Sequence, residues 1–379
     1  MNREAWRWGI GAWVALRVIS GVAAVYSAGS MPGDGVDVPG YDPPQLSGLV
    51  GAVVQPWLRA DGLWYLKIAV QGYGHDDGTL AFFPALPAAT AALQPLVGNE
   101  AYAALLVSNL ASLLGLVALF GFVAKVVDRR SARAAVVGLA LFPTSFFFVA
   151  PYGEAVLLFA GSAALLAAVS GRPVAGFALG AVAALSRPFG VLIALPMAFN
   201  AANQGGSSKR WLGPAGPVAG LGAWFAYTWN LTGDPLAAIR VQSSWQRELT
   251  AAWETLRLGF EQWRHYSEQS FGNYVAFDLA VTLFALALIP AAAWVLWHRG
   301  KVLLAVGLGL YGAAVVAAPL LLPFRARALM SNPRFALALF PLFLAYALVP
   351  SRARVPLALA SGAGMAVAAA VFIAGRPLF

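Results

Sequence analysis

The residues most suited to chemistry lie in one stretch between two apolar segments, "RADGLWYLKIAVQGYGHDDGTLAFFPALP" (59–87). One carboxylate in it, Asp61, stands close in sequence to the aromatic residues Trp57, Trp64 and Tyr65. A carboxylate near aromatic side chains and a lipid boundary is partly desolvated, which would raise its pKa and strengthen it as a general base. Aromatic rings also stack on the apolar faces of sugars. The stretch therefore fits a general base beside a sugar-binding surface.

Asp61 also begins a helical pattern. Apolar residues recur at helical spacing after it, and the pattern predicts a helix that stops at Gly72. An aspartate just ahead of a helix is often an N-cap, so both roles stay open for Asp61. The nearby aromatic residues can border a sugar or anchor the segment at the membrane interface, and for Trp57 we favour the interface.

Two arginines interrupt or open apolar segments elsewhere. Arg187 lies in "ALSRPFG", and Arg334 follows "SNP". Charged groups at membrane depth are costly and mark function by default, and a guanidinium can hold a phosphate with two hydrogen bonds. Arg187 can equally form a buried ion pair with a carboxylate such as Glu154, and Arg334 can anchor at the interface. Tyr152 and Glu154, in "APYGEA", can line the same site.

Signals for metal or thiol chemistry are weak. Asp76 and Asp77 are adjacent, but a divalent cation needs several oxygen ligands, and two acids before a glycine more often form a turn. The three histidines lie far apart, and the chain has no cysteine. We expect no cofactor; a divalent metal is compatible with the site but not required.

The elements that must position these residues are membrane helices. Of the 379 residues, 60% are hydrophobic and 11% are charged, whereas soluble domains are about half apolar and a quarter charged. Several apolar runs reach about 17 residues or more, enough to cross roughly 30 Å of hydrocarbon. The composition predicts an all-α polytopic membrane protein with candidate spans at 8–28, 102–126, 134–150, 153–170, 174–199, 212–230, 274–297, 302–323, 335–350 and 356–375.

Charge is distributed unevenly among the connections. All acidic residues except Glu4 and Asp128 lie in or beside two long loops, 29–83 and 231–273, or at helix ends on the same side. The positive-inside rule places the short basic connections in the cytoplasm together with residue 1, ahead of an uncleaved first span. These basic connections are 125–133, 171–172, 207–210, 298–301 and 351–354.

Two apolar stretches complicate the order of spans. Residues 81–97 contain three prolines and are predicted to be broken or re-entrant instead of crossing the membrane. Residues 174–199 are predicted to form a hairpin of two half-helices that meet at the internal Arg-Pro. Even then, the basic piece "FRAR" (324–327) falls on the outer side, against the positive-inside rule.

The two long loops are too long to be simple connections. Loops beyond about 12–15 residues are usually functional or disordered, and these carry too many aromatic residues for disorder. Residues 251–266 are predicted to form an amphipathic helix at the membrane interface. We expect a single transmembrane domain, 1–379, with its polar chemistry gathered at the extracytoplasmic face.

The chain offers no site for a soluble activated donor. No glycine-rich nucleotide loop follows a strand, no soluble domain is long enough to hold a nucleotide sugar, and no Ser-His-Asp set can be argued. If the chain is an enzyme, its activated substrate is lipid-borne.

The motif "ADGLWYLKIAVQGYG" followed by "LAFFPALP" resembles the PIG-V-like family, the bacterial relatives of the second GPI-anchor mannosyltransferase. Its members typically read W-D-G-x-W-Y-x-x-I-A-x-x-G-Y and then A-F-F-P-L-Y-P. The resemblance covers most of the chain. It departs at Ala60, where tryptophan is usual, at Ala85 and Leu86, where leucine and tyrosine are usual, and at Gly153, where serine is usual. The other blocks that agree in order are 106–120, 140–155, 184–190, 232–247 and 331–343.

The resemblance implies a GT-C fold, a bundle of about 10–12 transmembrane segments with a large first extracytoplasmic loop. It implies an inverting transferase in the cell membrane that moves a hexose, usually mannose, from a polyprenyl-phosphate donor to a lipid or glycan acceptor, without nucleic acid. Asp61 would be the base, and Arg187 and Arg334 would hold the departing phosphate. The residues that would border the sugar or acceptor are Trp64, Tyr65, Tyr152, Glu154, Gln242 and Trp245.

Two other functions remain open. A transporter or flippase for a lipid-linked sugar should show internal repeats and a midplane site between paired broken helices, whereas the sequence shows one such break and no clear repeat. A non-catalytic assembly partner could keep the fold, but the retention of Asp61 beside intact aromatic residues argues against it.

Overall fold

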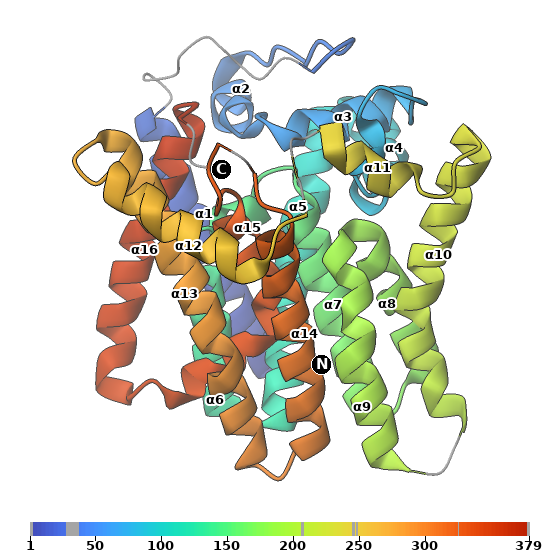
Figure 1. Cartoon of the computed structure of the whole chain (residues 1–379), viewed down its shortest axis with the longest axis vertical. Coiled ribbons are helices and arrows are strands. Elements are labelled where there is room, and N and C mark those ends of the chain that lie inside the picture. Colours follow the sequence, from blue (N-terminus) through green and yellow to red (C-terminus); the bar gives the residue numbers. More distant parts are fainter. Residues whose placement is uncertain are drawn as a thin grey trace.

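The chain folds as a helical bundle capped at one end by short loop helices (Figure 1). The computed structural model describes residues 3–27, 38–205, 208–244, 247, 249–324 and 326–376, without the side chains of 204, 242–244 and 270–272. These residues form helices and three isolated β-bridges, with no strand among them, which confirms the all-α prediction. Five helices are long and apolar enough to cross a membrane: α1 (Arg3–Ser27), α5 (Glu100–Val126), α13 (Ser270–Trp297), α14 (Val302–Leu321) and α16 (Ser351–Ile373).

Shorter helices complete the bundle. The predicted span 134–150 is wrong at its end, because α6 stops at Ala140 and the chain continues through Pro143 into a 3-10 turn. Proline lacks the amide donor that a helix needs and disfavours helical backbone before it. The shorter elements are α6 (Arg129–Ala140), η4 (Ser145–Phe148), α7 (Gly153–Val169), α10 (Leu212–Thr232), α15 (Asn332–Phe335) and η7 (Ala336–Leu348).

The predicted hairpin in 174–199 is present. α8 (Pro173–Ser186) ends before Arg187, whose backbone is extended with φ −157° and ψ 154°. Pro188 favours this extended conformation in the residue that precedes it. The chain then turns through η5 (Pro188–Ile193) and returns as α9 (Ala194–Gln204). Arg187 therefore lies at the turn between two helices and not in the middle of a span.

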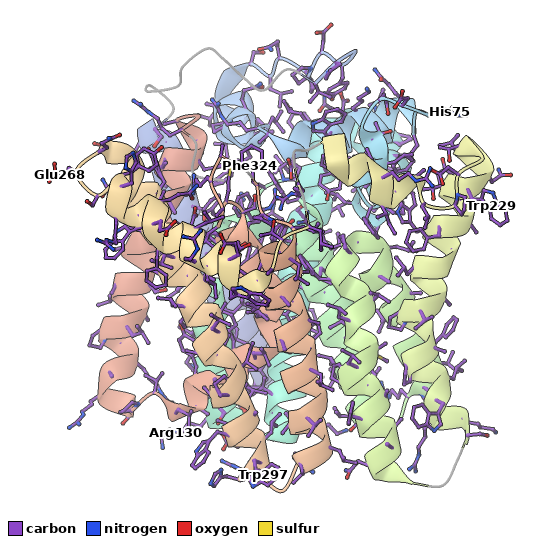
Figure 2. All side chains as sticks on the ribbon, in the orientation of Figure 1. His75, Arg130, Trp229, Glu268, Trp297 and Phe324 are labelled. Atoms are coloured by element: carbon purple, nitrogen blue, oxygen red, sulfur yellow. The ribbon has the colours of Figure 1, made fainter. Side chains whose placement is uncertain are left out.

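Long loops and short basic connections lie at opposite ends of the bundle. His75, Trp229, Glu268 and Phe324 are at one end, here called the loop end, and Arg130 and Trp297 are at the other (Figure 2). At the second end, Lys125 donates a hydrogen bond to Ser170, and Arg299 pairs with Asp128. The loop end carries η2 (Gln55–Trp57), η3 (Thr79–Ala81), α2 (Gly48–Val54), α3 (Asp61–Gln71), α4 (Ala85–Val97), α11 (Ala237–Ser244) and α12 (Ala252–His265).

The proline-rich stretch 81–97 does not form a full crossing. α4 has 13 residues and is therefore about 20 Å long, shorter than the hydrocarbon core. It lies at the loop end beside α3 (Figure 1). The prediction that this stretch would not cross agrees with the structure.

The predicted helix in 251–266 is present as α12, whose Trp253, Phe260 and Trp263 are exposed.

Helices α5 and α7 pack closely because a small residue separates them. A Cβ on Gly115 of α5 would lie 2.9 Å from the backbone nitrogen of Phe159 in α7. Small residues let helix backbones approach in membrane proteins. α7 is thereby held against the centre of the bundle, and its first turn carries Glu154.

A buried ion pair explains the basic piece that falls against the positive-inside rule. Arg327, in "FRAR", bonds to both carboxylate oxygens of Asp278 in α13, at 2.5 and 2.7 Å. Its side chain is 3% exposed and that of Asp278 is fully buried. Asn332 donates a hydrogen bond to Thr282 one turn along α13. Arg327 therefore fixes the segment before α15 to the bundle and is not a free positive charge.

We expect Asp278→Leu to destabilise the protein by about 3–5 kcal/mol, because it leaves a buried guanidinium without its partner. The double variant Asp278→Leu/Arg327→Met should recover most of the loss, since both charges are then absent. Thermal unfolding of the purified protein in detergent measures both effects. Arg257→Leu, which breaks an exposed pair with Glu254, should melt near the wild-type temperature. A double variant that melts no higher than Asp278→Leu would contradict this account.

Candidate active site

Asp61 is the first residue of α3, and its carboxylate is held by a distant arginine. The N-cap position belongs to Ala60, and no side chain caps the helix, so the N-cap role predicted as one option is wrong. Arg334 donates a hydrogen bond to Asp61 Oδ2 at 2.5 Å. The Asp61 side chain is 27% exposed and that of Arg334 is 10% exposed. The carboxylate therefore faces solvent on one side and a buried cation on the other.

Arg334 also reaches the first turn of α7. Its Nε lies 3.4 Å from Glu154 Oε1, and Arg187 lies 3.3 Å from the same oxygen. All three side chains are at least nine-tenths buried. The result is a chain of alternating charges, Asp61–Arg334–Glu154–Arg187, here called the charge chain. It brings together four predicted site residues and confirms that Arg187 pairs with Glu154.

Glu154 suits its position at the start of a helix. Tyr152 is the N-cap of α7, and Glu154 lies in its first turn, where the positive end of the helix dipole favours a carboxylate. Neither carboxylate oxygen has a hydrogen bond in the described structure, although both arginines lie close by. Glu154 thus balances the charge of the arginines without fixing either one tightly.

Backbone strain accompanies both ends of the Asp61–Arg334 pair. Among the described residues, two that are not glycine have positive φ: Ala60 (47°), directly before Asp61, and Ser331 (71°), three residues before Arg334. Such conformations cost about 1–3 kcal/mol and persist where surrounding structure imposes them, often at functional sites. The segment of Arg334 is further held by Thr144, whose hydroxyl donates to the carbonyl of Pro333 at 2.8 Å.

Two buried tyrosines, Tyr65 and Tyr152, border the charge chain, and their contact with a sugar or acceptor stays a prediction. Arg187 donates to the Tyr65 hydroxyl at 3.4 Å, and the Tyr152 ring lies 5.6 Å from the Arg334 guanidinium. The Tyr152 hydroxyl donates to the Arg59 carbonyl, which ties α7 to the turn before α3. Gly153 lets the start of α7 approach the end of α8, because a Cβ there would meet the Ser186 carbonyl at 2.7 Å.

The remaining predicted aromatic residues lie elsewhere or outside the described part. Trp64 stacks on Phe82 with ring centroids 5.4 Å apart, and Lys67 lies over the Trp64 ring. Trp57 is 2% exposed within the core cluster, so its predicted place at the lipid interface is wrong. Gln242 lies in α11 with its side chain undescribed, and Trp245 lies outside the described residues. Their contact with a sugar stays a prediction.

A third arginine that the sequence did not single out joins this cluster. Arg247, in the second long loop, lies 5.8 Å from the Phe335 ring. Arg187 and Arg334 lie 5.5 and 5.2 Å from the same ring. Arg247 is one of four arginines in the second long loop, and the signal in the sequence was its place within a block shared with the resembled family. The spacing of residues in the sequence did not indicate that Arg247 lies beside Phe335.

The pKa of Asp61 moves in the direction opposite to the prediction. Burial, the largest single effect, raises it, but the charge and hydrogen bond of Arg334 together with the charges of Arg187 and Arg247 lower it by more. The net pKa lies below the ordinary value of 3.8. Asp61 is therefore ionised at neutral pH while Arg334 holds it. The aromatic neighbours of Asp61 in the sequence indicated burial alone. They carried no information about the arginines that lower its pKa.

The adjacent acids Asp76 and Asp77 differ in their roles. Asp76 is exposed, whereas Asp77 pairs with Lys67 at 2.9 Å and accepts hydrogen bonds from Thr79. These contacts close the turn before η3. No group of three or more His, Cys, Asp and Glu residues that could hold a metal ion occurs in the part of the chain that the structure describes.

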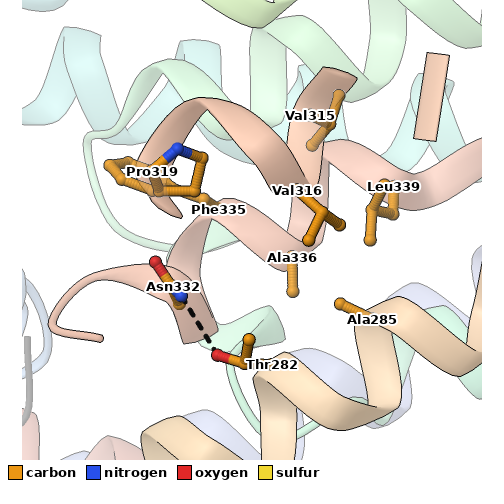
Figure 3. Close-up of a pocket in the computed structure, with 9 residues that line it drawn as sticks. All are labelled: Thr282, Ala285, Val315, Val316, Pro319, Asn332, Phe335, Ala336 and Leu339. Atoms are coloured by element: carbon orange, nitrogen blue, oxygen red, sulfur yellow. Dashed lines mark hydrogen bonds between the residues drawn. The ribbon is translucent and has the colours of Figure 1, made fainter. Parts of the chain in front are cut away.

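An apolar pocket lies next to the charge chain. It is a small space lined by residues of α13, α14, α15 and η7 (Figure 3). Phe335 is one of its lining residues and also the ring around which the three arginines gather. The side chain of Phe335 thus lies between this apolar pocket and the guanidinium groups of the three arginines.

Comparison with known proteins gives only remote similarity. No family model matches the chain, and no curated protein matches it. A structure of the oligosaccharyltransferase AglB from Archaeoglobus fulgidus, with an inhibitory peptide and a dolichol-phosphate, has 15% identity and a TM-score of 0.46, and covers 97% of this chain and 56% of that one. A structure of the Archaeoglobus fulgidus oligosaccharyltransferase with Zn and sulfate has 14% identity and a TM-score of 0.42, and covers 94% and 53%. The chain spans about half the length of these proteins, and similarity of this degree carries no argument about its activity.

Ala60→Gly should raise the melting temperature. Glycine adopts a positive φ without the strain of roughly 1–3 kcal/mol, which exceeds the roughly 0.5–1 kcal/mol that glycine loses in chain entropy. Thermal unfolding in detergent measures the change. Ala88→Gly, the same substitution at an exposed position of α4, should lower the melting temperature. A decrease of similar size for Ala60→Gly would show that Ala60 is not strained.

The Asp61–Arg334 pair should make stability depend on pH in a defined direction. Because the pKa of folded Asp61 lies below 3.8, its stabilisation is complete above that value and is lost as the pH falls through the folded pKa. The difference in melting temperature between wild type and Asp61→Asn should be constant above about pH 5 and shrink in more acidic buffer. In an Arg334→Gln background Asp61 has no such partner, so the difference in melting temperature that Asp61→Asn makes should vanish or change sign. A difference that grows on acidification would refute the pair's effect.

Proposed function

We propose that this protein is an inverting membrane glycosyltransferase of the GT-C type. It would move a hexose, mannose in the family that its sequence resembles, from a polyprenyl-phosphate donor to an extracytoplasmic lipid or glycan acceptor. The observation that carries the proposal is the partly exposed Asp61 carboxylate, held at the loop end by a buried chain of arginines and a glutamate. A carboxylate beside anion-binding groups is what transfer of a sugar from a phosphate requires.

The two arginines of the charge chain would hold the donor phosphate. A guanidinium binds phosphate oxygens in a bidentate manner and needs no proton exchange. Arg334 and Arg187 now neutralise Asp61 and Glu154. A phosphate that engages Arg334 would compete with Asp61 for it, and the pKa of Asp61 would then rise as the opposing charge is shared. Donor binding would in this way strengthen the base.

The chemical step would be a displacement at the anomeric carbon. The acceptor hydroxyl oxygen forms a bond to that carbon as its proton passes to Asp61, while the bond from the carbon to the phosphate oxygen breaks. The electron pair leaves with the polyprenyl phosphate, whose added negative charge the arginines stabilise. Attack from the face opposite the leaving group inverts the configuration. The step needs no metal, although the site does not exclude one.

The surroundings of the charge chain fit a lipid-borne donor. The pocket that ends at Phe335 lies among α13 and α14, two helices able to cross a membrane. An isoprenoid chain lying along these two helices would place its phosphate beside the arginines. Tyr65 and Tyr152 lie beside the same groups and would border the sugar, with Trp64, Gln242 and Trp245 as further candidates. Helices α3 and α11 would cover the site.

The transporter alternative has less support. Asp61 begins the loop helix α3, Glu154 lies in the first turn of α7, and Arg187 lies at the turn after α8, so the charges are at helix ends. A midplane site formed by paired broken helices would place its polar groups deeper. An assembly partner without activity would have no need of an ionised carboxylate kept accessible beside arginines.

Asp61→Asn should reduce sugar transfer by about 100- to 10,000-fold, the usual contribution of a general base. The purified protein in liposomes would receive polyprenyl-phosphate-mannose or GDP-mannose, each with a panel of lipid and glycan acceptors. We expect transfer from the lipid donor alone. A single cooperative thermal transition between pH 5 and 7, lowered by no more than the loss of the Asp61–Arg334 pair, shows that the variant is folded.

Asp76→Asn serves as the matched control, since Asp76 is an exposed carboxylate of the same loop. It should keep wild-type transfer. Transfer that persists in Asp61→Asn would remove Asp61 from the reaction, and wild-type protein that binds the donor without turnover would favour the transporter or the assembly partner.

A further inference from the structure

The second long loop is fixed to the carboxyl end of α14. Helix ends leave carbonyl groups without intrahelical partners, and here three successive carbonyls receive donors from the loop. Their negative partial charges also favour a nearby cation. The contacts are Thr255 Oγ1 to Leu320 O at 2.7 Å, Thr250 N to Leu321 O at 2.9 Å, and Arg247 to Leu322 O at 2.9 Å.

Arg247 is the one of these donors that carries a full charge, and it is placed beside the charge chain. Its guanidinium shares the Phe335 ring with those of Arg187 and Arg334. Burial lowers the pKa of Arg247, and the charge of Arg334 lowers it further, with Asp61 opposing. The groups around Arg247 therefore carry more positive than negative charge.

A count of charges shows where the excess lies. Asp61 pairs with Arg334, and Glu154 lies within ion-pair distance of both Arg334 and Arg187. Two carboxylates thus balance two arginines. Within the described residues, the contacts of Arg247 are with a carbonyl and an aromatic ring, with no carboxylate in ion-pair distance. The described residues of the cluster thus carry one positive charge beyond balance, which suits an anion site.

We propose that Arg247 is a third arginine of the phosphate site, and that it moves from the Leu322 carbonyl to a phosphate oxygen when a polyprenyl phosphate binds. The inference rests on the proposed function and adds a residue from the second loop to it. Arg187 and Arg334 share their charge between the phosphate and the carboxylates of Asp61 and Glu154, so Arg247 supplies the net charge that matches a singly charged phosphodiester. When the sugar leaves, the phosphate gains a second negative charge, and Arg247 stays beside it.

Two substitutions separate this role from that of a helix cap. Arg247→Gln keeps an amide donor for the Leu322 carbonyl and removes the charge, whereas Arg247→Lys keeps the charge. Arg240→Gln is the matched control: Arg240 lies in the same loop, its side chain is 70% exposed, and it pairs with Asp234 at 3.0 Å. None of the three changes a residue of the charge chain.

The test is binding of polyprenyl phosphate to the purified full-length protein in detergent micelles, with polyprenol and inorganic phosphate as probes of the two parts of the ligand. We expect Arg247→Gln to bind polyprenyl phosphate about 10- to 100-fold more weakly, since hydrogen bonds to charged groups have that effect. Arg247→Lys should lie between Arg247→Gln and wild type, and Arg240→Gln should equal wild type. Polyprenol binding should be the same in all four proteins.

Each possible result either supports or overturns the role of Arg247. Equal polyprenyl phosphate affinity in wild type and Arg247→Gln overturns the role of Arg247, and the proposed function stands if transfer still depends on Asp61. No binding by wild type overturns both. Tight binding of inorganic phosphate that Arg247→Gln abolishes, without binding of the lipid, also overturns the proposal, because the site then serves a free anion. If Arg247→Gln lowers the melting temperature, Arg247→Lys decides: recovered binding supports the proposal, and binding as weak as that of Arg247→Gln overturns it.

Discussion

The arrangement of the loop end depends on one ion pair, between Asp61 and Arg334, which joins residues 273 positions apart in the chain. Charges removed from water are costly unless they are paired with good geometry. Asp61 begins a loop helix and Arg334 begins the segment that leads into η7, so the pair holds the first loop onto the carboxyl-terminal part of the bundle. Ala60 and Ser331, close in the chain to the two partners, both have positive φ angles.

Other contacts of the bundle support this pair by fixing its two sides. The Asp278–Arg327 pair anchors the segment that precedes Arg334, and Thr144 holds the carbonyl of Pro333. On the other side, the Tyr152 hydroxyl bonds to the Arg59 carbonyl. Because a carboxylate and guanidinium must be placed to within a fraction of an ångström, loops alone would position them poorly. The surrounding helices supply the rigidity.

Interruptions of helices by proline bring the remaining charges to the same place. Pro188 ends α8 so that Arg187 lies at a turn. Pro143 follows the early end of α6, and the next residue, Thr144, reaches the carbonyl of Pro333. Polar backbone exposed by such breaks must be buried in protein within a membrane. The breaks gather at the loop end, where the charge chain and the pocket beside Phe335 adjoin. A site of this kind can meet a ligand that has an anionic head and an apolar chain.

The sequence by itself determined the helical membrane class, the separation of acidic loops from short basic connections, the break at Arg187 and the helix from Asp61 to its stop at Gly72. These follow from local rules of hydropathy, charge and proline geometry that act within a few residues. Only the tertiary structure decided that Asp61 meets Arg334, that Arg247 joins Phe335, that Trp57 is buried and that the pKa of Asp61 falls. The reason is that burial and Coulomb energies are sums over neighbours in space, and these neighbours come from parts of the chain hundreds of residues apart.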